Sequence, residues 1–343
     1  MRVVLADPSA FTPPYDHELA AALTRAGAEV ELVTSPFRFG EAPKPAGYKR
    51  SESFYPLSSR LFRRSPLRLP LKAAEHAPGM LALLRRRPDV LHLQWLAAPE
   101  LDRVLCRPRV PSIFTAHDLL PRRTAGKRAL WRTLLARFDR VIVHTEHGRK
   151  ALAELGVDAH VIPHPVFPSD PARSNDGQTV LALGVIRAYK GIGDAVEATR
   201  RIGARLLVAG DPIDAVSLDA PHVEARLGYL PDSEVDRALG ESAVAVFPYR
   251  PELDQSGALL RALGAGVPAV AYDVGGIAEP IRRFDAGRVV TAGDVDALAD
   301  ALRELLEDSD ALERARAGAR RARAELTWDA AANAHLELYR ELL

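Results

Sequence analysis

Two cations follow a strand-like run in the second half of the sequence, within the glycine-containing segment Gly184–Asp194. Glycine lets a backbone approach a ligand closely, and a guanidinium with an ammonium at the carboxyl end of a strand suits two phosphate groups. Lys190 is the last of only six lysines, in a chain with 40 arginines, which argues against an ordinary surface charge. The segment lacks the spacing of a dinucleotide fingerprint and of a P-loop. We therefore expect Arg187 and Lys190 to bind a diphosphate beside Gly184.

A second candidate anion site begins at Ser256 and Gly257, where the sequence predicts a loop, which includes Asp254, followed by a helix N-terminus. The unpaired N–H groups and the dipole of a helix N-terminus attract anions. Ser256 on its own is better explained as an ordinary N-cap. Two anion-binding turns from successive crossovers of one domain can, however, bind the same diphosphate.

Polar residues also end strand-like runs in the first half. His117 and Asp118 follow one such run, and a histidine beside a carboxylate at a strand end is well placed for ligand contact. His92 ends another run, and there a ligand contact and a structural role remain equally open. We interpret His144 and His147, three residues apart with no third ligand evident, as structural and not metal-binding.

Strand-like runs alternate with helical patterns along the whole sequence, which is typical of parallel sheets covered by helices. Each half contains six such runs, so the sequence predicts an α/β protein of two doubly wound, Rossmann-like domains. Such sheets bind ligands beyond the carboxyl ends of their strands, and we expect the site in a cleft that the two domains face. The runs are 2–6, 29–33, 89–93, 112–116, 140–144 and 160–163, then 179–184, 205–210, 222–226, 243–248, 268–272 and 287–290.

The proline-rich segment 163–171 predicts the hinge between the domains, because its four prolines fit neither a helix nor a central strand. Residues 37–71 contain five prolines with little periodicity and predict a long, partly mobile loop that carries acceptor or membrane contacts. The segment 294–324 is helical in pattern. Thr327 opens one last predicted helix, which ends at Leu343.

The composition describes a globular protein: 343 residues, 47% hydrophobic, 27% charged and a mean hydropathy of −0.09. This length predicts two domains. No signal-peptide pattern follows Met1, and the single cysteine, Cys106, excludes an internal disulfide and a thiolate zinc cluster. Both observations favour a cytoplasmic protein.

The net charge of +1 conceals two oppositely charged halves. Residues 1–168 contain 26 Lys and Arg against 16 Asp and Glu, whereas the remainder contains 20 against 29. Basic residues interleaved with apolar ones between 44 and 87 fit two readings equally, namely peripheral contact with an anionic membrane and a solvated arginine-rich face. Nucleic-acid binding is disfavoured because no binding motif accompanies the charge.

Taken in order, several motifs resemble the retaining glycosyltransferases of family 4, which have the GT-B fold of two Rossmann-like domains, and the resemblance covers nearly the whole chain. It implies a first domain at 1–167, joined by a closing helix at 328–343, and a donor-binding domain at 168–327. The motifs are Phe114–Asp118, Val161–Pro165, Gly184–Gly191, Gln255–Leu260 and Gly266–Glu279.

The resemblance implies transfer of a hexose from a nucleotide-diphosphate sugar, such as a UDP- or GDP-sugar, to a saccharide, lipid-linked or small-molecule acceptor with retained configuration. No cofactor or catalytic metal is expected, and polysaccharide biosynthesis is the expected setting. His117, Arg187 and Lys190 would be catalytic. The donor would contact Gly184, Tyr229, Leu230, Asp254, Ser256, Gly257, Gly275, Gly276 and Glu279, and the acceptor side would contain Thr12, Tyr15, His92 and Asp118.

Two departures from the family pattern stand out. Arg261 occupies the position of a glutamate that commonly binds the ribose, and a guanidinium cannot accept the hydrogen bonds of a diol. The loop 7–15 replaces a frequent Gly-Gly loop on the acceptor side. Arg261 leaves open a non-catalytic nucleotide-sugar-binding protein of a polysaccharide assembly. A nucleotide-sugar epimerase on the same fold is a further alternative.

Overall fold

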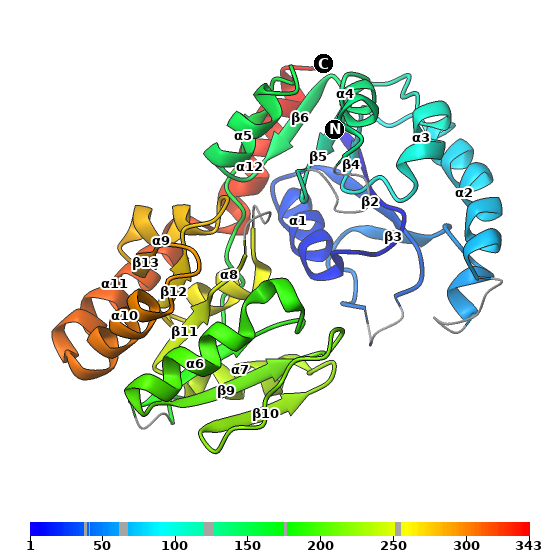
Figure 1. The fold of residues 1–343 in the computed structure, drawn as a ribbon. Helices are drawn as coiled ribbons and strands as arrows, with labels where there is room; N and C mark the ends of the chain where they lie inside the picture. Colours follow the sequence, from blue (N-terminus) through cyan, green and yellow to red (C-terminus); the bar gives the residue numbers. More distant parts are fainter. Residues whose placement is uncertain (38–39, 41, 62–67, 120–125, 175–176, 251–254) are drawn as a thin grey trace. The chain divides into compact units, whose positions relative to one another are not determined.

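The computed structural model describes residues 1–37, 40, 42–61, 68–119, 126–174, 177–250 and 255–343. Its contacts divide the chain into two units (Figure 1). Unit 1 contains Met1–Pro163 and Trp328–Leu343, and unit 2 contains His164–Thr327. The predicted α/β fold with two parallel, doubly wound sheets is confirmed.

Unit 1 has a parallel sheet whose described strands follow the order β3-β2-β1-β4-β5-β6-β7. The strand order reverses between β1 and β4, which makes their carboxyl ends the switch point at which such folds bind ligands. Most of these strands are short apolar runs buried by helices. The strands are β1 (Arg2–Asp7), β2 (Glu29–Thr34), β3 (Lys49–Glu52), β4 (Val90–Leu93), β5 (Ser112–Thr115), β6 (Arg140–Val143) and β7 (His160–Val161).

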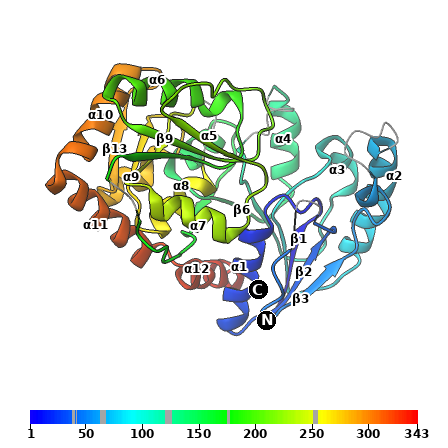
Figure 2. The same ribbon diagram turned by 90° about the horizontal axis from the view of Figure 1, so that it is seen from below.

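The final helix of the chain, α12 (Trp328–Arg340), belongs to unit 1 and packs against α1 (Pro13–Arg25), as Figure 2 shows. Arg25 forms an ion pair with Asp329 of this helix at 2.6 Å. The other helices of the unit are α2 (Arg68–Leu84), α3 (Pro99–Leu105), α4 (Arg128–Leu135), α5 (Glu146–Ala153) and the short 3-10 helix η1 (Ser58–Arg60).

Unit 2 has a parallel sheet in the order β10-β9-β8-β11-β12-β13, with its switch point between β8 and β11. The central strands are buried along their whole length, as expected for a sheet covered on both faces. The strands are β8 (Thr179–Leu183), β9 (Arg205–Gly210), β10 (Val223–Leu227), β11 (Val244–Phe247), β12 (Ala269–Tyr272) and β13 (Gly287–Val290).

Side chains cap three helix starts in the described part of unit 2. Ser256, Asp294 and Asp308 each accept a hydrogen bond from a backbone N–H of the first turn that follows. The helices are α6 (Ile192–Ile202), α7 (Asp232–Glu241), α8 (Gly257–Gly264), α9 (Ala278–Phe284), α10 (Val295–Glu307), α11 (Ser309–Glu325) and the 3-10 helix η2 (Ala188–Lys190).

The expectation of one long loop over residues 37–71 needs correction. The structure forms β3 at Lys49–Glu52, η1 at Ser58–Arg60 and the start of α2 at Arg68 within this range. The sequence of β3, Lys-Arg-Ser-Glu, has no apolar alternation, because β3 is the edge strand of the described sheet and pairs there with β2. None of the helices in the described ranges is long and apolar enough to span a membrane.

Candidate functional site

The turn between β8 and α6 lies at the switch point of unit 2, and two glycines shape it. Gly184 has φ +103° and Gly191 has φ +64°, conformations that favour glycine. A Cβ at Gly191 would collide with the carbonyl oxygen of Pro248, which directly follows β11. The turn is therefore packed against the end of the neighbouring strand, and its backbone path is tightly restricted.

Lys190 points back across this turn. Its Nζ lies 4.9 Å from the centroid of the Tyr249 ring, a cation–π contact. A Cβ built on Gly184 would be 3.3 Å from Nζ and 3.2 Å from the Cβ of Ala258, in the first turn of α8. The lysine thus lies between the β8 turn and the region where α8 begins.

Tyr249 connects the two turns that the sequence predicts to bind anions. Its hydroxyl is 3.0 Å from Oγ of Ser256, and this Oγ accepts a hydrogen bond from the Leu259 N–H at 3.3 Å. Lys190 contacts the face of the same tyrosine ring. The structure therefore brings Lys190 and the Ser256–Gly257 helix start together at one edge of the sheet. Asp254, also predicted there, lies outside the described residues.

Arg187 is half-buried at the start of η2, and the carboxylate of Asp214 accepts a hydrogen bond from the next N–H, that of Ala188, at 3.0 Å. Among the described residues, neither Arg187 nor Lys190 takes part in an ion pair, so no carboxylate of that set competes with an anionic ligand. Other arginines of unit 2 are paired with carboxylates: Arg200, Arg201, Arg205, Arg226, Arg237, Arg250, Arg261, Arg282, Arg283, Arg288, Arg303, Arg320 and Arg323.

Gly275 and Gly276 form the turn between β12 and α9, one strand away from β11. Gly275 has φ +50°, and the Glu279 N–H donates to the Gly276 carbonyl at 3.2 Å. Arg282 forms two hydrogen bonds of 2.8 and 2.6 Å with Asp273, which lower the pKa of that carboxyl and connect α9 to the end of β12. The half-buried Glu279 is thereby held at the carboxyl edge of the sheet.

Tyr229 and Leu230 follow the edge strand β10. Leu230 packs against the core, whereas Tyr229 is 56% exposed. Arg261, the residue that departs from the family pattern, forms an ion pair of 2.7 Å with Asp232 and lies 5.5 Å from the centroid of the Phe167 ring. Burial and Asp232 raise the pKa of Tyr229, while Arg261 opposes them. The structure thus places a carboxylate beside the unexpected guanidinium.

His117 lies in a chain of hydrogen-bonded side chains in unit 1. Its Nε2 is 2.9 Å from Oε1 of Gln94, and its Nδ1 is 3.3 Å from Nε2 of His144. His144 Nδ1 in turn contacts the carbonyl of Ile162 at 2.9 Å, and because a carbonyl only accepts, His144 donates there.

Aromatic rings enclose His117 on two sides. The Trp95 ring stacks on it at a centroid distance of 5.2 Å, and the Tyr15 ring meets it edge-on at 4.7 Å. The Trp95 indole N–H donates to Oγ1 of Thr12 at 2.9 Å, which joins the β1 loop to the β4 loop. Tyr15 therefore contacts His117, Thr12 is connected to it through Trp95, and Asp118 is exposed next to it.

The assignment of His92 to the acceptor side needs correction. His92 is fully buried, with Nδ1 2.7 Å from the Tyr339 hydroxyl of α12 and Nε2 2.7 Å from Oγ1 of Thr115. Burial, together with His335 and His144, lowers its pKa well below the usual value, so the ring is neutral. Gln94 Nε2 lies 3.3 Å from His92. His92 thus supports the chain behind His117 and cannot touch an acceptor.

Sequence reasoning missed four residues of these two sites. Tyr249 resembles a core aromatic at a strand end, and His144 was interpreted as structural only. Gln94 and Trp95 directly follow β4, and their place after a strand at the switch point was the one available signal.

Comparisons with known proteins agree with this architecture. A model described as Glycosyltransferase Family 4 matches residues 15–170, and one described as Glycosyl transferases group 1 matches residues 177–308. Glycogen synthase of Mycobacterium tuberculosis is 28% identical over 285 residues, covering 74% of this chain and 69% of that protein. D-inositol 3-phosphate glycosyltransferase of Mycobacterium avium is 26% identical over 392 residues, with coverages of 96% and 88%.

Solved structures show the same fold. Sucrose-phosphate synthase of Thermosynechococcus elongatus has a TM-score of 0.77 at 19% identity and covers 100% of this chain and 99% of its own. HepE of Anabaena, solved with UDP-glucose, has a TM-score of 0.72 at 15% identity and covers 100% of both chains. The two sheets therefore correspond to the two Rossmann-like domains of the GT-B fold.

Proposed function

We propose that this chain, which belongs to the family 4 and group 1 glycosyltransferases, transfers a hexose from a nucleotide-diphosphate sugar to an acceptor hydroxyl. The donor would be a UDP- or GDP-sugar, and the anomeric configuration would be retained. The acceptor would be a saccharide, lipid-linked or small-molecule hydroxyl, in cytoplasmic polysaccharide biosynthesis. Relatives named as glycogen synthase and D-inositol 3-phosphate glycosyltransferase, and the UDP-glucose complex of HepE, support a nucleotide-sugar donor.

One observation carries this proposal: Lys190 and the helix start at Ser256 meet on Tyr249 at the switch point of unit 2. An ammonium and free helix N–H groups at one place form a site for a diphosphate. As the glycosidic bond breaks, negative charge develops on this leaving group. Each well-placed donor to that charge contributes about 3 kcal/mol to the rate, and Arg187 would be a further cation of this kind.

Because Arg187 and Lys190 supply positive charge for the diphosphate, we expect transfer without a divalent metal. We predict that an excess of EDTA leaves kcat within a factor of about two of its value in untreated protein. Loss of a group that stabilises the developing charge would have a larger effect. Measurement of turnover with and without EDTA, and again after Mg²⁺ is returned, tests this. A large loss that Mg²⁺ restores would contradict it.

Unit 1 would provide the acceptor side. His117 would contact the donor sugar, with Thr12, Tyr15 and Asp118 toward the acceptor. Both ring nitrogens of His117 have hydrogen-bond partners within unit 1, so a ligand must either share or replace one of them.

The main test is substitution of the two cations. We expect Lys190→Ala and Arg187→Ala each to reduce kcat/KM by about a hundredfold, since each removes a donor to the developing charge, with unchanged thermal unfolding. Arg200→Ala is the matched control, because Arg200 is exposed on α6 and pairs with Glu197. Turnover near the wild-type rate in both variants would refute the assignment.

Two other functions are separated by simple measurements. A non-catalytic nucleotide-sugar-binding protein, suggested by Arg261, would neither hydrolyse nor transfer from any donor. A nucleotide-sugar epimerase would invert C2 of the sugar without transfer, which NMR detects. Measured transfer removes both. The Arg261–Asp232 pair supplies a carboxylate in the region where this chain lacks the family's glutamate.

Membrane contact through residues 44–87 is a separate proposal. Several of its cations have partners within the protein: Lys49 and Arg86 pair with Glu31, and Lys72 donates to Ser9. Lys44, Arg60, Arg85 and Arg87 are exposed, and so are the apolar Leu57, Leu69 and Leu81. We expect weak binding to anionic vesicles that salt abolishes, and no binding at low salt would refute it.

A further inference from the structure

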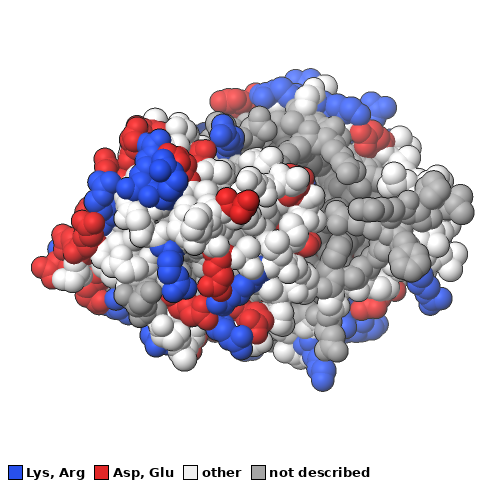
Figure 3. Space-filling view, turned by 60° about the horizontal axis from the view of Figure 1, so that its bottom comes forward, with Lys and Arg blue, Asp and Glu red and all other residues white. Residues whose placement is uncertain are grey.

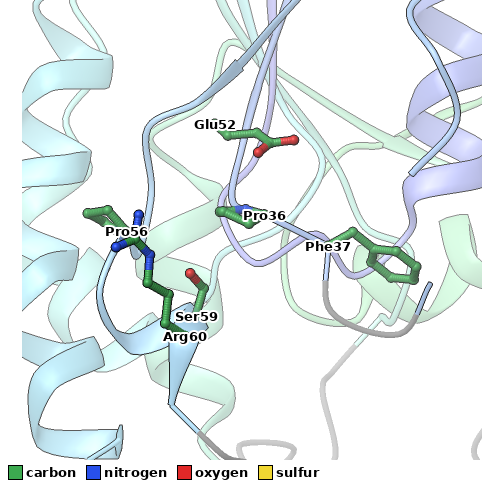
Figure 4. Close-up of a pocket in the computed structure, with 6 residues that line it drawn as sticks. All are labelled: Pro36, Phe37, Glu52, Pro56, Ser59 and Arg60. Atoms are coloured by element: carbon green, nitrogen blue, oxygen red, sulfur yellow. The ribbon is translucent and has the colours of Figure 1, made fainter. Parts of the chain in front are cut away.

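A pocket of about 460 Å³ opens in unit 1 at the carboxyl ends of β2 and β3 (Figure 4). This volume is within the range of small-molecule sites. The strand register sets Glu52 at the end of β3 opposite Thr34 at the end of β2. The pocket is lined by Pro36, Phe37, Glu52, Pro56, Ser59 and Arg60.

The lining combines opposite charges with an apolar surface. Figure 4 shows Glu52 on one side of Pro36, Ser59 and Arg60 on another, and the Phe37 ring to the side. A carboxylate accepts hydrogen bonds from hydroxyl groups, a guanidinium donates them, and prolines and an aromatic ring suit the C–H face of a sugar. Glu52 is paired with Arg50 at 3.3 Å, and Arg60 is exposed on the other side of the pocket, so the lining offers both hydrogen-bond acceptors and donors. These groups suit the hydroxyl groups of a neutral, hydroxyl-rich ligand.

A narrower space of about 20 Å³, room for one water-sized group, shares Phe37 and Glu52 with this pocket. Asp16 also lines it, and its Oδ1 is buried without a hydrogen-bond partner among the described residues. Burial and the neighbouring Asp7 raise the pKa of Asp16 well above its usual range, which favours a neutral carboxyl group. Such a group can both donate to and accept from a hydroxyl.

The pocket lies at a distance from His117 along the sheet edge. The strand order places β3 four strands from β5, after which His117 follows. At about 4.8 Å per strand this separation is roughly 19 Å, more than a single sugar ring can bridge.

We infer that this pocket binds a neutral sugar ring of the acceptor at a distance from the hydroxyl that reacts, so that the acceptor is an oligosaccharide or longer glycan. The inference rests on the proposed transfer reaction and specifies its second substrate. Glu52 and Arg60 are then specificity-determining residues for the acceptor.

Ligand-observed NMR with maltotriose, mannotriose and chitotriose as neutral probes, and with glucose 6-phosphate as an anionic probe, tests this. We expect at least one trisaccharide to bind the full chain at millimolar concentration, and more tightly than glucose 6-phosphate. If no trisaccharide binds, or if the anion binds more tightly than each of them, the inference is wrong.

Variants locate the binding. Glu52→Gln and Arg60→Ala should each weaken the bound trisaccharide about tenfold, because each removes a charged hydrogen-bond partner. Glu29→Gln, an exposed carboxylate at the other end of β2, and Arg85→Ala, an exposed cation outside the pocket, are the matched controls and should bind as the wild type does. Equal affinity in the pocket variants and the controls would overturn the assignment, and thermal unfolding of all four confirms their fold.

Titration with UDP, GDP and ADP separates this inference from the proposed function. If no nucleotide binds the wild-type chain, the donor proposal fails whatever the trisaccharides do. If a nucleotide binds with the same affinity to wild type and Glu52→Gln while no trisaccharide binds, the pocket inference alone fails.

Discussion

Lys190 and Ser256 are far apart in sequence, and one tyrosine ring brings them together. Each turn was recognisable on its own, because glycines next to cations and a serine before a helix are local patterns. Tyr249, the residue that both turns contact, could not be recognised from the sequence. A tyrosine at the end of an apolar strand looks the same in the sequence whether it fills the core or joins two turns. Tyr249 is 2% exposed and does both.

The same limit applies in unit 1. The sequence indicated His117 because it ends a strand beside a carboxylate, but the stacked Trp95 and the two partners of its nitrogens come from other strands. Pairing of strands distant in sequence decides such contacts. His92 also ends a strand, but its ring is fully buried and cannot touch an acceptor.

A prediction at this scale concerns Gln94. We expect Gln94→Leu to reduce kcat about tenfold with little change in the affinity for a nucleoside diphosphate, since leucine offers His117 Nε2 no hydrogen-bond partner. Gln94→Glu keeps an acceptor and should retain most of the activity. Steady-state kinetics over pH, with ¹⁵N NMR of the His117 ring, distinguishes positioning from loss of fold. Equal losses in both variants, or an unchanged pH profile in Gln94→Leu, would contradict this role.

Among the elements, all of the predicted strand-like runs coincide with strands. Most of them were recognisable because buried parallel strands are continuous apolar runs. The sequence did not predict the edge strand β3. Its residues Lys-Arg-Ser-Glu are held in place by pairing with β2 and by the ion pair of Lys49 with Glu31. It contributes Glu52 to the pocket, so the missed element carries the inferred acceptor site.

A prediction for the turn between β8 and α6 compares Gly191, at the end of the turn, with Gly193, in the first turn of α6. Gly191→Ala should destabilise the protein by more than about 1 kcal/mol and weaken nucleotide binding, because the methyl group meets the Pro248 carbonyl at a left-handed φ. Gly193→Ala, two residues on in α6 with nothing near the added methyl, should stabilise by about 0.5–1 kcal/mol. Urea unfolding and titration with UDP or GDP measure both. A neutral Gly191→Ala would show that the turn is not restricted as described.

For the whole molecule, the composition predicted the charge difference between the two halves. It did not predict how the charged side chains are arranged on the surface. Over much of the described surface in Figure 3, Lys and Arg side chains lie beside Asp and Glu side chains. The ion pairs of unit 2 agree with this pattern, since most of its arginines are matched by a nearby carboxylate. Net charge alone therefore overstates the charge that is open to a partner.

A pH dependence of stability follows from buried histidines. Burial lowers the pKa of His335, on α12, to about 4. Between its usual pKa of 6.5 and that value the unfolded chain binds a proton that the folded chain excludes, so stability falls as pH falls through this window. The loss reaches about 3 kcal/mol for this residue. Urea unfolding at pH 7 and pH 4 should therefore show a smaller loss for His335→Leu than for wild type, whereas parallel losses would contradict the assignment.

The direct test of the central claim is a crystal structure with whichever of UDP, GDP or ADP binds most tightly. The account predicts phosphate oxygens within about 3 Å of Lys190 Nζ and of the backbone N–H groups at the start of α8. A diphosphate bound elsewhere on unit 2, with Lys190 still resting on Tyr249 and no anion at Ser256, would contradict it.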